Sequence, residues 1–345
     1  MPLKKIQDAD VAGKRVLMRV DFNVPIQNGV MGDDMRIKAA VPTIELLRQK
    51  GAAHITLMTH WGRPEGVEES LRTAPLFKHL GELTDVANVK MLENVRFDTR
   101  EDSNDEAYAK ELASNQDIFV NDAFAVCHRA ASSVVGVTKF LPPYAGLLVQ
   151  KEVAEISEAL QPEEPALAII GGAKFETKIP LLTKLLEVYG QILLGGALAN
   201  DMLKARGLVD IKNSVASDTP VPAEMVADAR ILVPTDYVWQ EDKIIDIGLD
   251  TLQHWSTILA IQKFVLWNGP VGWYEKGGSA GTDGLASALI NSQAHAVIGG
   301  GNTAEAISKI KFDEAKVFVS TGGGAMLELI TKGTLPGLEP LRRQG

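Results

Sequence analysis

The 345-residue sequence contains a single cysteine, Cys127, so it cannot form an internal disulfide, and it lacks the paired cysteines of structural zinc sites. No apolar stretch approaches the roughly 20 residues that a membrane-spanning helix needs, and residues 1–15 lack the hydrophobic segment of a secretory signal. These absences predict a cytoplasmic protein with no membrane partner. We assign no chemistry to Cys127, because a lone cysteine is most often a small buried hydrophobe.

Positive charge is also scarce, since 35 Lys and Arg face 44 Asp and Glu and give a formal net charge of -9. Nonspecific nucleic-acid binding depends on clustered Lys and Arg, so the balance argues against a nucleic-acid partner. An anionic ligand would instead need a local basic pocket. Apolar residues are plentiful, at 46% of the chain, which is enough to bury a core in each of about two domains.

The first half of the sequence alternates strand-like runs with helical patterns, which predicts an α/β fold with a parallel sheet. The runs are expected at residues 15–20, 54–59, 89–92 and 117–120. In such sheets, ligands bind outside the carboxyl ends of the strands. Every predicted strand end delivers polar or cationic side chains, namely Asp21 and Asn23, then His60 and Arg63, then Arg96, then Arg129, and Arg36 begins the helix after the first strand.

Four arginines and one histidine are therefore expected at one edge of the first sheet. A lone arginine is most often a solvated surface residue. The shared position of these residues at one edge of the sheet is what indicates a binding site. Guanidinium groups match carboxylate and phosphate oxygens bidentately. The pattern favours a small ligand with several negative charges, such as a sugar-phosphate-like acid.

The second half predicts another parallel sheet, with different residues at the strand ends. Strand runs are expected at 166–170, 191–194, 231–233, 264–267, 296–298 and 317–320, and five of the six end in glycine. Glycines let backbone amides approach an anion, and a following helix turns its positive end toward it, so phosphate binding is expected. No GxxxxGK[ST] loop and no GxGxxG after the first strand occurs, which disfavours a Walker-type NTPase and a dinucleotide dehydrogenase.

An amphipathic stretch connects the two halves. Val149, Val153, Ile156 and Leu160 give a helical stripe, and a Pro/Glu-rich segment ends it. We expect this helix to act as a hinge between the domains. A reaction that joins two ligands held on different domains needs closure to expel water, so the organisation favours phosphoryl transfer.

Short motifs occur along almost the whole chain, in the order RVDFNVP, DDMRI, THWGRP, ENVRF, VNDAF with CHRA, GGAKFETK, WNGP, GGGNT and STGGGA. In this order they resemble the phosphoglycerate kinase family. The resemblance implies two doubly wound, Rossmann-like domains joined by a hinge helix, and reversible transfer of a phosphoryl group between 1,3-bisphosphoglycerate and ADP, giving 3-phosphoglycerate and ATP with Mg²⁺. We expect a monomer. The implied parts are a phosphoglycerate-binding domain at 1–148, the interdomain helix at 149–163, a nucleotide-binding domain at 164–329 and a C-terminal segment, 330–345, that returns to the first domain.

The resemblance also implies a role for individual residues. Arg36 and Lys174, with backbone amides at Gly323 and Gly324, are implied to act on the transferring group. The implied substrate-binding residues are Asp21, Phe22, Asn23, Arg36, His60, Trp61, Gly62, Arg63, Arg96 and Arg129. The implied nucleotide-binding residues are Gly172, Ala173, Lys174, Lys178, Gly195, Gly196, Asn268, Glu275, Gly300, Gly301, Asn302 and Thr303.

The chain departs from the family pattern at several positions. Asn302 stands where the family usually has the aspartate that ligates nucleotide-bound Mg²⁺, and an amide oxygen can ligate only without charge. Ala197 replaces the third glycine of the family's three-glycine run. The segments at 79–91 and 212–246 are shorter than in relatives.

Two other functions fit the sequence less well. A non-catalytic binder would explain Asn302, but the retained Lys174 and Lys178 and the five basic groups argue against it. A nicotinamide dehydrogenase shares the sheet architecture but lacks the fingerprint glycines and their paired acid.

Overall fold

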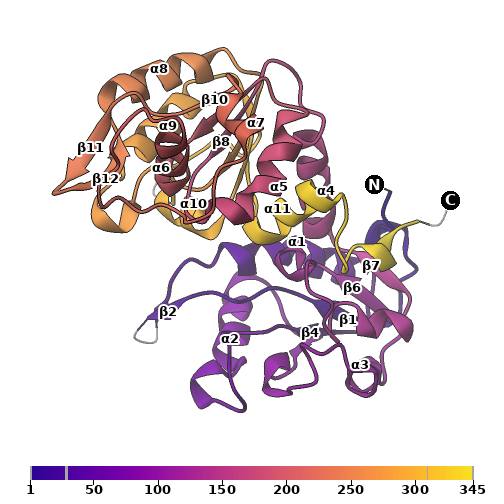
Figure 1. Ribbon diagram of the computed structural model, residues 1–345. Helices are drawn as coiled ribbons and strands as arrows, with labels where there is room; N and C mark the ends of the chain where they lie inside the picture. Colours follow the sequence, from indigo (N-terminus) through magenta and orange to yellow (C-terminus); the bar gives the residue numbers. More distant parts are fainter. Residues whose placement is uncertain (1, 28–29, 309, 344–345) are drawn as a thin grey trace. The chain divides into compact units, whose positions relative to one another are not determined.

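The chain folds into two compact units (Figure 1). The computed structural model describes residues 2–27, 30–308 and 310–343. Unit 1 comprises Met1–Ala154 and Lys332–Gly345, and unit 2 comprises Glu155–Thr331. The chain passes from unit 1 to unit 2 inside helix α4 (Leu147–Ala159) and returns inside helix α11 (Gly323–Lys332). None of the helices in the described residues is long and apolar enough to span a membrane.

Unit 1 is built on a five-stranded parallel sheet. Its strand order, β5-β4-β1-β6-β7, reverses direction between β1 and β6, as in doubly wound folds. The four strands expected from the sequence are present, and β7 is an additional edge strand. The strands are β1 (Arg15–Arg19), β4 (His54–Met58), β5 (Val89–Met91), β6 (Ile118–Asn121) and β7 (Pro143–Ala145).

The helices of unit 1 cover both faces of this sheet because successive strand residues point to opposite sides. Val16 and Met18 of β1 pack in one core cluster with apolar residues of α1 and α2, whereas Leu17 packs in another with residues of α3. The elements are α1 (Met35–Gln49), α2 (Ala74–Leu83) and α3 (Glu106–Ala113), with short 3-10 helices at Ile6–Asp8, Glu69–Leu71, Val95–Phe97, Phe124–Val126, Gly136–Lys139 and Glu339–Leu341.

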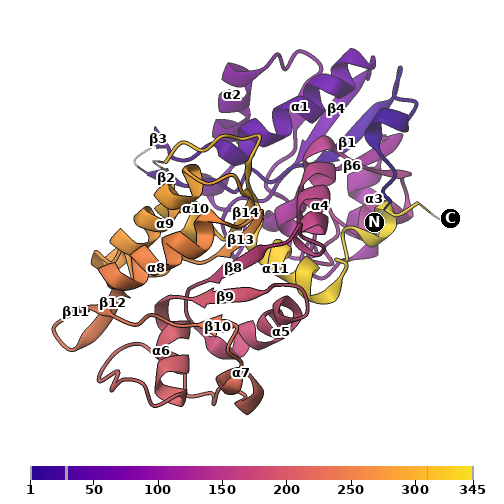
Figure 2. The ribbon, with the colours of Figure 1, turned by 90° about the horizontal axis from the view of Figure 1, so that it is seen from above.

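Unit 2 contains a six-stranded parallel sheet in the order β10-β9-β8-β13-β14-β15, which is the Rossmann order with its reversal between β8 and β13. All six strands expected from the sequence are present. Figure 2 shows α8 and α9 on one side of this sheet and α5 on the other. The strands are β8 (Ala166–Ile170), β9 (Gln191–Leu194), β10 (Ile231–Leu232), β13 (Phe264–Asn268), β14 (His295–Gly299) and β15 (Val317–Val319).

The core of unit 2 again follows strand alternation. Leu167 and Ile169 of β8, with Trp267 of β13, pack in one cluster with Trp255 of α8 and Leu285 of α9. Fully buried strands of this kind explain the near-continuous apolar runs in the sequence. The helices are α5 (Phe175–Leu186), α6 (Gly196–Ala205), α7 (Ala223–Ala227), α8 (Leu249–Ala260), α9 (Ala280–Ile290), α10 (Gly301–Ala306) and, on the 3-10 pattern, Tyr274–Lys276.

Two antiparallel hairpins were not expected from the sequence. They are β2 (Ile26–Gln27) with β3 (Val30–Met31), and β11 (Tyr237–Gln240) with β12 (Lys243–Ile247). The first has only two residues in each strand, and the second contains a register shift between Val238 and Trp239, so neither shows the regular alternation by which strands are recognised.

Helix α4 begins on a buried carboxylate at the end of β6. Asp122 Oδ1 accepts the backbone N–H of Leu148 at 2.9 Å, and Thr43 Oγ1 accepts that of Leu147, also at 2.9 Å. Burial raises the pKa of Asp122 to about 7. The first turn of the helix that leaves unit 1 is therefore fixed by groups from β6 and α1.

The C-terminal residues of the described chain lie in unit 1. Leu3 forms an antiparallel bridge with Arg342, and Asn121 Nδ2 donates to the carbonyl oxygen of Gly337 at 3.2 Å. Gly337 lies so close to Cys127 that an added Cβ would stand 2.9 Å from the cysteine Cα. Gly337 thus covers part of Cys127, which is completely buried, and that burial raises the pKa of Cys127 to about 12.

Candidate functional site

The carboxyl edge of the unit 1 sheet brings an aspartate and an arginine into direct contact. Asp21 follows β1 at the strand reversal and is 6% exposed, and Arg36 lies in the first turn of α1. Arg36 Nη1 lies 2.7 Å from Asp21 Oδ2 and 3.4 Å from the carbonyl oxygen of Asn23. Asp21 thus holds the Arg36 guanidinium at the edge where ligands bind.

Gly62 connects the ends of two strands. Its N–H donates to Asn23 Oδ1 at 2.9 Å, and its carbonyl oxygen accepts Arg96 Nη1 at 2.9 Å. The backbone there has a φ of +67°, which glycine adopts without a steric penalty. The turn after β4 therefore orients both the amide of Asn23 and the guanidinium of Arg96.

Three arginines line a depression of about 450 Å³ at this edge. Arg63 and Arg129 are exposed and form no ion pair with any residue that the structure describes. Arg96 is more buried, with Asp102 Oδ1 at 3.6 Å from its Nε. Glu65, Asp98 and Asp102 also line the depression, but Arg129 and Arg63 still repel Arg96 and, after burial, lower its pKa, so an anion would stabilise the cluster.

His60 lies behind these cations. It is 5% exposed, with its Nδ1 at 3.3 Å from Arg19 Nη2 and 3.7 Å from Asp21 Oδ1. Burial and the surrounding positive charge hold the pKa of His60 well below its usual range. The imidazole is therefore neutral and serves as a hydrogen-bonding group rather than a charge. The charges responsible belong to Arg19, Arg96, Arg36 and Arg129.

Arg19 belongs to the same network but was not among the expected site residues. Its side chain is 2% exposed, and its Nε donates to Ser133 Oγ at 2.8 Å. Ser133 Oγ in turn donates to Glu101 Oε1 at 2.6 Å, and Glu101 is also 2% exposed. The sequence did contain a signal for Arg19, because it is a charged residue in an otherwise apolar strand. A buried charge needs a partner, so its position indicates a buried polar network.

Two expected substrate-binding residues point into the core. The Phe22 side chain is completely buried, and Trp61 is 7% exposed with its Nε1 donating to the carbonyl oxygen of Val24 at 3.0 Å. Only their backbone groups remain to face a ligand. The Phe22 N–H already donates to Thr59 Oγ1 at 2.9 Å.

Unit 2 contains a mostly apolar cavity of about 330 Å³ beside the carboxyl ends of β8 and β13. Among the expected nucleotide residues, its lining includes Gly172, Ala173, Gly196, Glu275 and Asn302, and it also includes Ala197. Another part of the lining comes from Leu203 of α6 and from Tyr237 and Ile245 of the β11–β12 hairpin, which was not expected from the sequence. Val215 and Val271 line the cavity from loops.

The two expected lysines are placed differently. Lys178 Nζ donates to Asn268 Oδ1 at 3.2 Å, and burial lowers the pKa of this lysine. Lys174 precedes α5 in a left-handed conformation, with a φ of 64°. The spacing of four residues between Lys174 and Lys178 predicts that both side chains lie on one helix face, and this prediction is wrong, because the chain turns at Lys174 before the helix begins.

The glycine loops after β14 and β15 are in backbone contact. A Cβ on Gly323 would stand 2.2 Å from the nitrogen of Gly300, whereas one on Gly301 or Gly324 would meet nothing within 4 Å. Gly323 therefore serves close packing, and Gly301 and Gly324 leave open space at the starts of α10 and α11. Such helix starts present free N–H groups to an anion.

Gly195 and Thr303 support the loops from within. A Cβ on Gly195 would stand 2.5 Å from the Cα of Val271. The glycine therefore lets the chain after β9 pack against the loop that follows β13. Thr303 is completely buried, and its Oγ1 accepts the N–H of Gly269 at 2.7 Å and donates to the carbonyl oxygen of Gly299 at 3.0 Å. Its hydroxyl joins two strand ends.

Comparison with known proteins gives a consistent result. A sequence model of the family described as "Phosphoglycerate kinase" matches residues 6–333. Proteins of that name from Roseiflexus sp. (strain RS-1) and Nostoc punctiforme (strain ATCC 29133 / PCC 73102) are each 38% identical, covering 99% and 98%, respectively, of both chains.

Solved structures show the same likeness. A phosphoglycerate kinase from Coxiella burnetii has a TM-score of 0.86 at 32% identity and covers 99% of both chains. One from Pyrococcus horikoshii OT3 has a TM-score of 0.84 at 28% identity and covers 98% of both. The expected α/β fold with parallel sheets is confirmed.

The depressed pKa of His60 predicts a pH dependence of folding stability. Below about pH 6.5 the unfolded chain binds a proton that the folded chain does not, so the free energy of unfolding falls as the pH falls, by up to about 1.4 kcal/mol per pH unit. We expect His60→Gln to flatten this dependence between about pH 6.5 and 5 in urea unfolding followed by circular dichroism. His254→Gln, at an exposed histidine of α8, is the control and should keep the wild-type slope. Equal slopes in His60→Gln and the wild type would contradict the assignment.

Proposed function

Since the chain belongs to the phosphoglycerate kinase family, we propose that the basic edge of unit 1 holds the acid substrate and that the glycine-lined cavity of unit 2 holds the nucleotide. The protein catalyses reversible phosphoryl transfer between 1,3-bisphosphoglycerate and ADP, giving 3-phosphoglycerate and ATP in glycolysis. The observation that carries the division of roles is the convergence of Arg36, Arg96 and Arg129 around neutral His60, with Arg63 acting on Arg96.

The acid is held by groups of two kinds. Asp21 and Asn23 are hydrogen-bonding residues, and their fixed orientation suits the hydroxyl and acid end of phosphoglycerate. Arg63, Arg96 and Arg129 surround the depression and suit the phosphate that is not transferred. His60 completes this set as a neutral partner, because a charged imidazole would be repelled by the arginines.

The nucleotide is held mainly by backbone and apolar surface. Glycine residues let the base approach the chain closely, and Glu275 in the cavity lining suits the ribose hydroxyls. Lys178, fixed by Asn268, suits the nucleotide phosphates. The open positions at Gly301 and Gly324 suit a phosphate at the starts of α10 and α11.

The transfer itself needs no covalent intermediate. The transferring group is spread loosely in the transition state, so catalysis rests on alignment and on cations placed where charge is spread. Arg36 approaches from the acid side, and Lys174 from the nucleotide side. We infer that closure about the two chain crossings, in α4 and α11, brings the two ligands into line and excludes water.

Members of the family use MgADP and MgATP. The cavity lining offers the neutral amide of Asn302, and Mg²⁺ commonly takes one or two protein oxygens while keeping waters and phosphate ligands. The residues present therefore fit an ion carried mainly by the nucleotide, with Asn302 as its protein contact. When bound, the ion neutralises phosphate charge.

Arg36→Ala and Lys174→Ala should lower turnover by about 10²- to 10³-fold with little change in the Michaelis constants, because each removes a charge that acts mainly in the transition state. A coupled assay of ATP consumption with 3-phosphoglycerate measures both quantities. Lys184→Ala, at an exposed lysine of α5 paired with Glu187, is the matched control and should keep wild-type turnover. Normal turnover with only raised Michaelis constants in the first two variants would show that these roles are wrong.

Asn302→Asp should bind MgADP about fivefold more tightly than the wild type, because a charged ligand to the ion replaces a neutral one. Isothermal titration calorimetry checks this. With ADP and a chelator in place of Mg²⁺, Asn302→Asp should bind ADP more weakly than the wild type, because the new carboxylate then faces the phosphates without the ion between them. Equal MgADP affinities would rule out a contact between residue 302 and the ion.

A further inference from the structure

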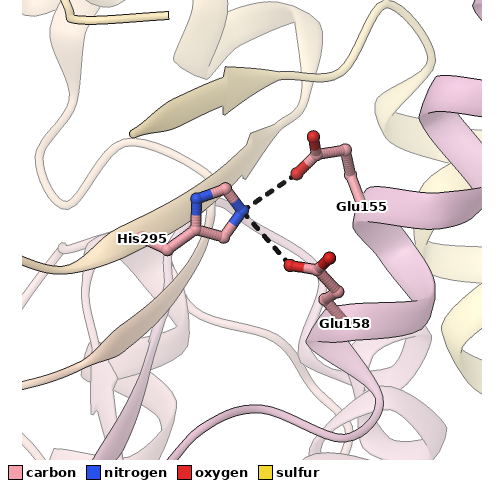
Figure 3. Close-up of side chains that lie close together, drawn as sticks. All are labelled: Glu155, Glu158 and His295. Atoms are coloured by element: carbon pink, nitrogen blue, oxygen red, sulfur yellow. Dashed lines mark hydrogen bonds and ion pairs between the residues drawn. The ribbon is translucent and has the colours of Figure 1, made fainter. Parts of the chain in front are cut away.

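Three potential metal ligands meet in unit 2, among residues that have no role in the reaction described above. Glu155 and Glu158 lie one turn apart on the last part of α4, and His295 is the first residue of β14 (Figure 3). His295 Nε2 lies 2.9 Å from Glu155 Oε2 and 3.6 Å from Glu158 Oε2. Within the described part of the chain, this is the one group whose three ligand atoms all lie within 4.8 Å of one another.

The backbone fixes these side chains before any ion binds. Residues three apart on a helix share a face, so Glu155 and Glu158 project toward the same point. His295 is paired with Phe264 of the neighbouring strand, and its N–H donates to the carbonyl oxygen of Lys263 at 2.8 Å. Its ring also packs against the Phe264 ring, with the centroids 5.5 Å apart.

His79 also contacts two carboxylates, but it differs from His295 in which ring nitrogens they approach. At His79 in unit 1, Asp34 contacts Nε2 at 3.0 Å and Glu82 contacts Nδ1 at 3.1 Å. Those carboxylates lie on different sides of the ring and cannot share an ion with one nitrogen. At His295 both carboxylates approach the same nitrogen, so the three atoms surround a common point.

We propose that His295 Nε2 and the carboxylates of Glu155 and Glu158 form a binding site for a divalent transition metal of the Zn²⁺ class. Bonds of about 2 Å in tetrahedral geometry place ligand atoms about 3.3 Å apart, close to the separations of 2.9 and 3.6 Å around Nε2. One imidazole nitrogen suits Zn²⁺, whereas Mg²⁺ favours an all-oxygen octahedral set. Glu158 is 65% exposed, so water completes the coordination.

The site is structural, since it joins the end of α4 to the first residue of β14. A ligand that binds only the folded chain stabilises it in proportion to its saturation. Zn²⁺ therefore raises the thermal midpoint of the wild type, and the loss of any one ligand reduces that rise.

The test uses the full-length protein, treated with a chelator and dialysed, with no nucleotide present. Titration with ZnCl₂ in a calorimeter should show one Zn²⁺ per chain. Because losing a group that merely orients a metal ligand weakens binding by about 10- to 100-fold, His295→Ala should weaken it by at least about tenfold. Glu155→Gln should do the same, and Co²⁺ should give the intense visible absorption of a tetrahedral site only in the wild type.

His79→Ala is the matched control, because it removes a histidine that also contacts two carboxylates, and it should bind Zn²⁺ like the wild type. Thermal melts without metal and the coupled kinase assay show whether each variant is folded. If His295→Ala fails to fold, Glu158→Gln at the exposed ligand gives the same comparison. No Zn²⁺ uptake by the wild type, or uptake unchanged in the ligand variants, would overturn the proposal.

Discussion

Repulsion among like charges at the carboxyl edge of the unit 1 sheet, together with burial, determines both the neutral state of His60 and the kind of ligand that this edge can bind. Burial first, and then the charges of Arg19, Arg96, Arg36 and Arg129, keep the imidazole of His60 neutral. The chain tolerates the repulsion because Asp21 pairs with Arg36, and because the buried Glu101 carboxylate reaches Arg19 through Ser133. These acids leave Arg63 and Arg129 exposed for a ligand, and an anion with several charges removes the remaining repulsion.

Unit 2 also has a parallel sheet, but its site depends on close backbone approach rather than on charged side chains. A nucleotide presents a flat base and a chain of phosphates, so close approach of the backbone matters more than side-chain charge. Glycines at the ends of β8, β9, β14 and β15 serve this in different ways. Some pack loop against loop, as Gly323 does on Gly300, and others, such as Gly324, leave the space that a phosphate needs.

The sequence predicted much of this and missed the parts that depend on contacts between distant segments. Long apolar runs located all the strands of both sheets except β7, and their ends located the basic residues, because parallel strands deliver their carboxyl ends to one edge. The sequence did not show that the Phe22 side chain is a core residue. Its neighbours Asp21 and Asn23 lie at the site, whereas its own ring faces the core. Hairpin β11–β12 was missed because its register shift breaks the alternation. In the Arg19–Ser133–Glu101 chain, Arg19 and Ser133 lie 114 positions apart in the sequence, and no local pattern encodes their contact.

Calorimetric titration of Arg129→Ala with 3-phosphoglycerate and, separately, with MgADP tests the central claim most directly. Loss of one charge-assisted contact costs about 1.5–3 kcal/mol, so the account predicts that the affinity for 3-phosphoglycerate falls by about tenfold or more. It also predicts that the affinity for MgADP is unchanged. An unchanged affinity for 3-phosphoglycerate would contradict the claim that the arginines of unit 1 capture the acid.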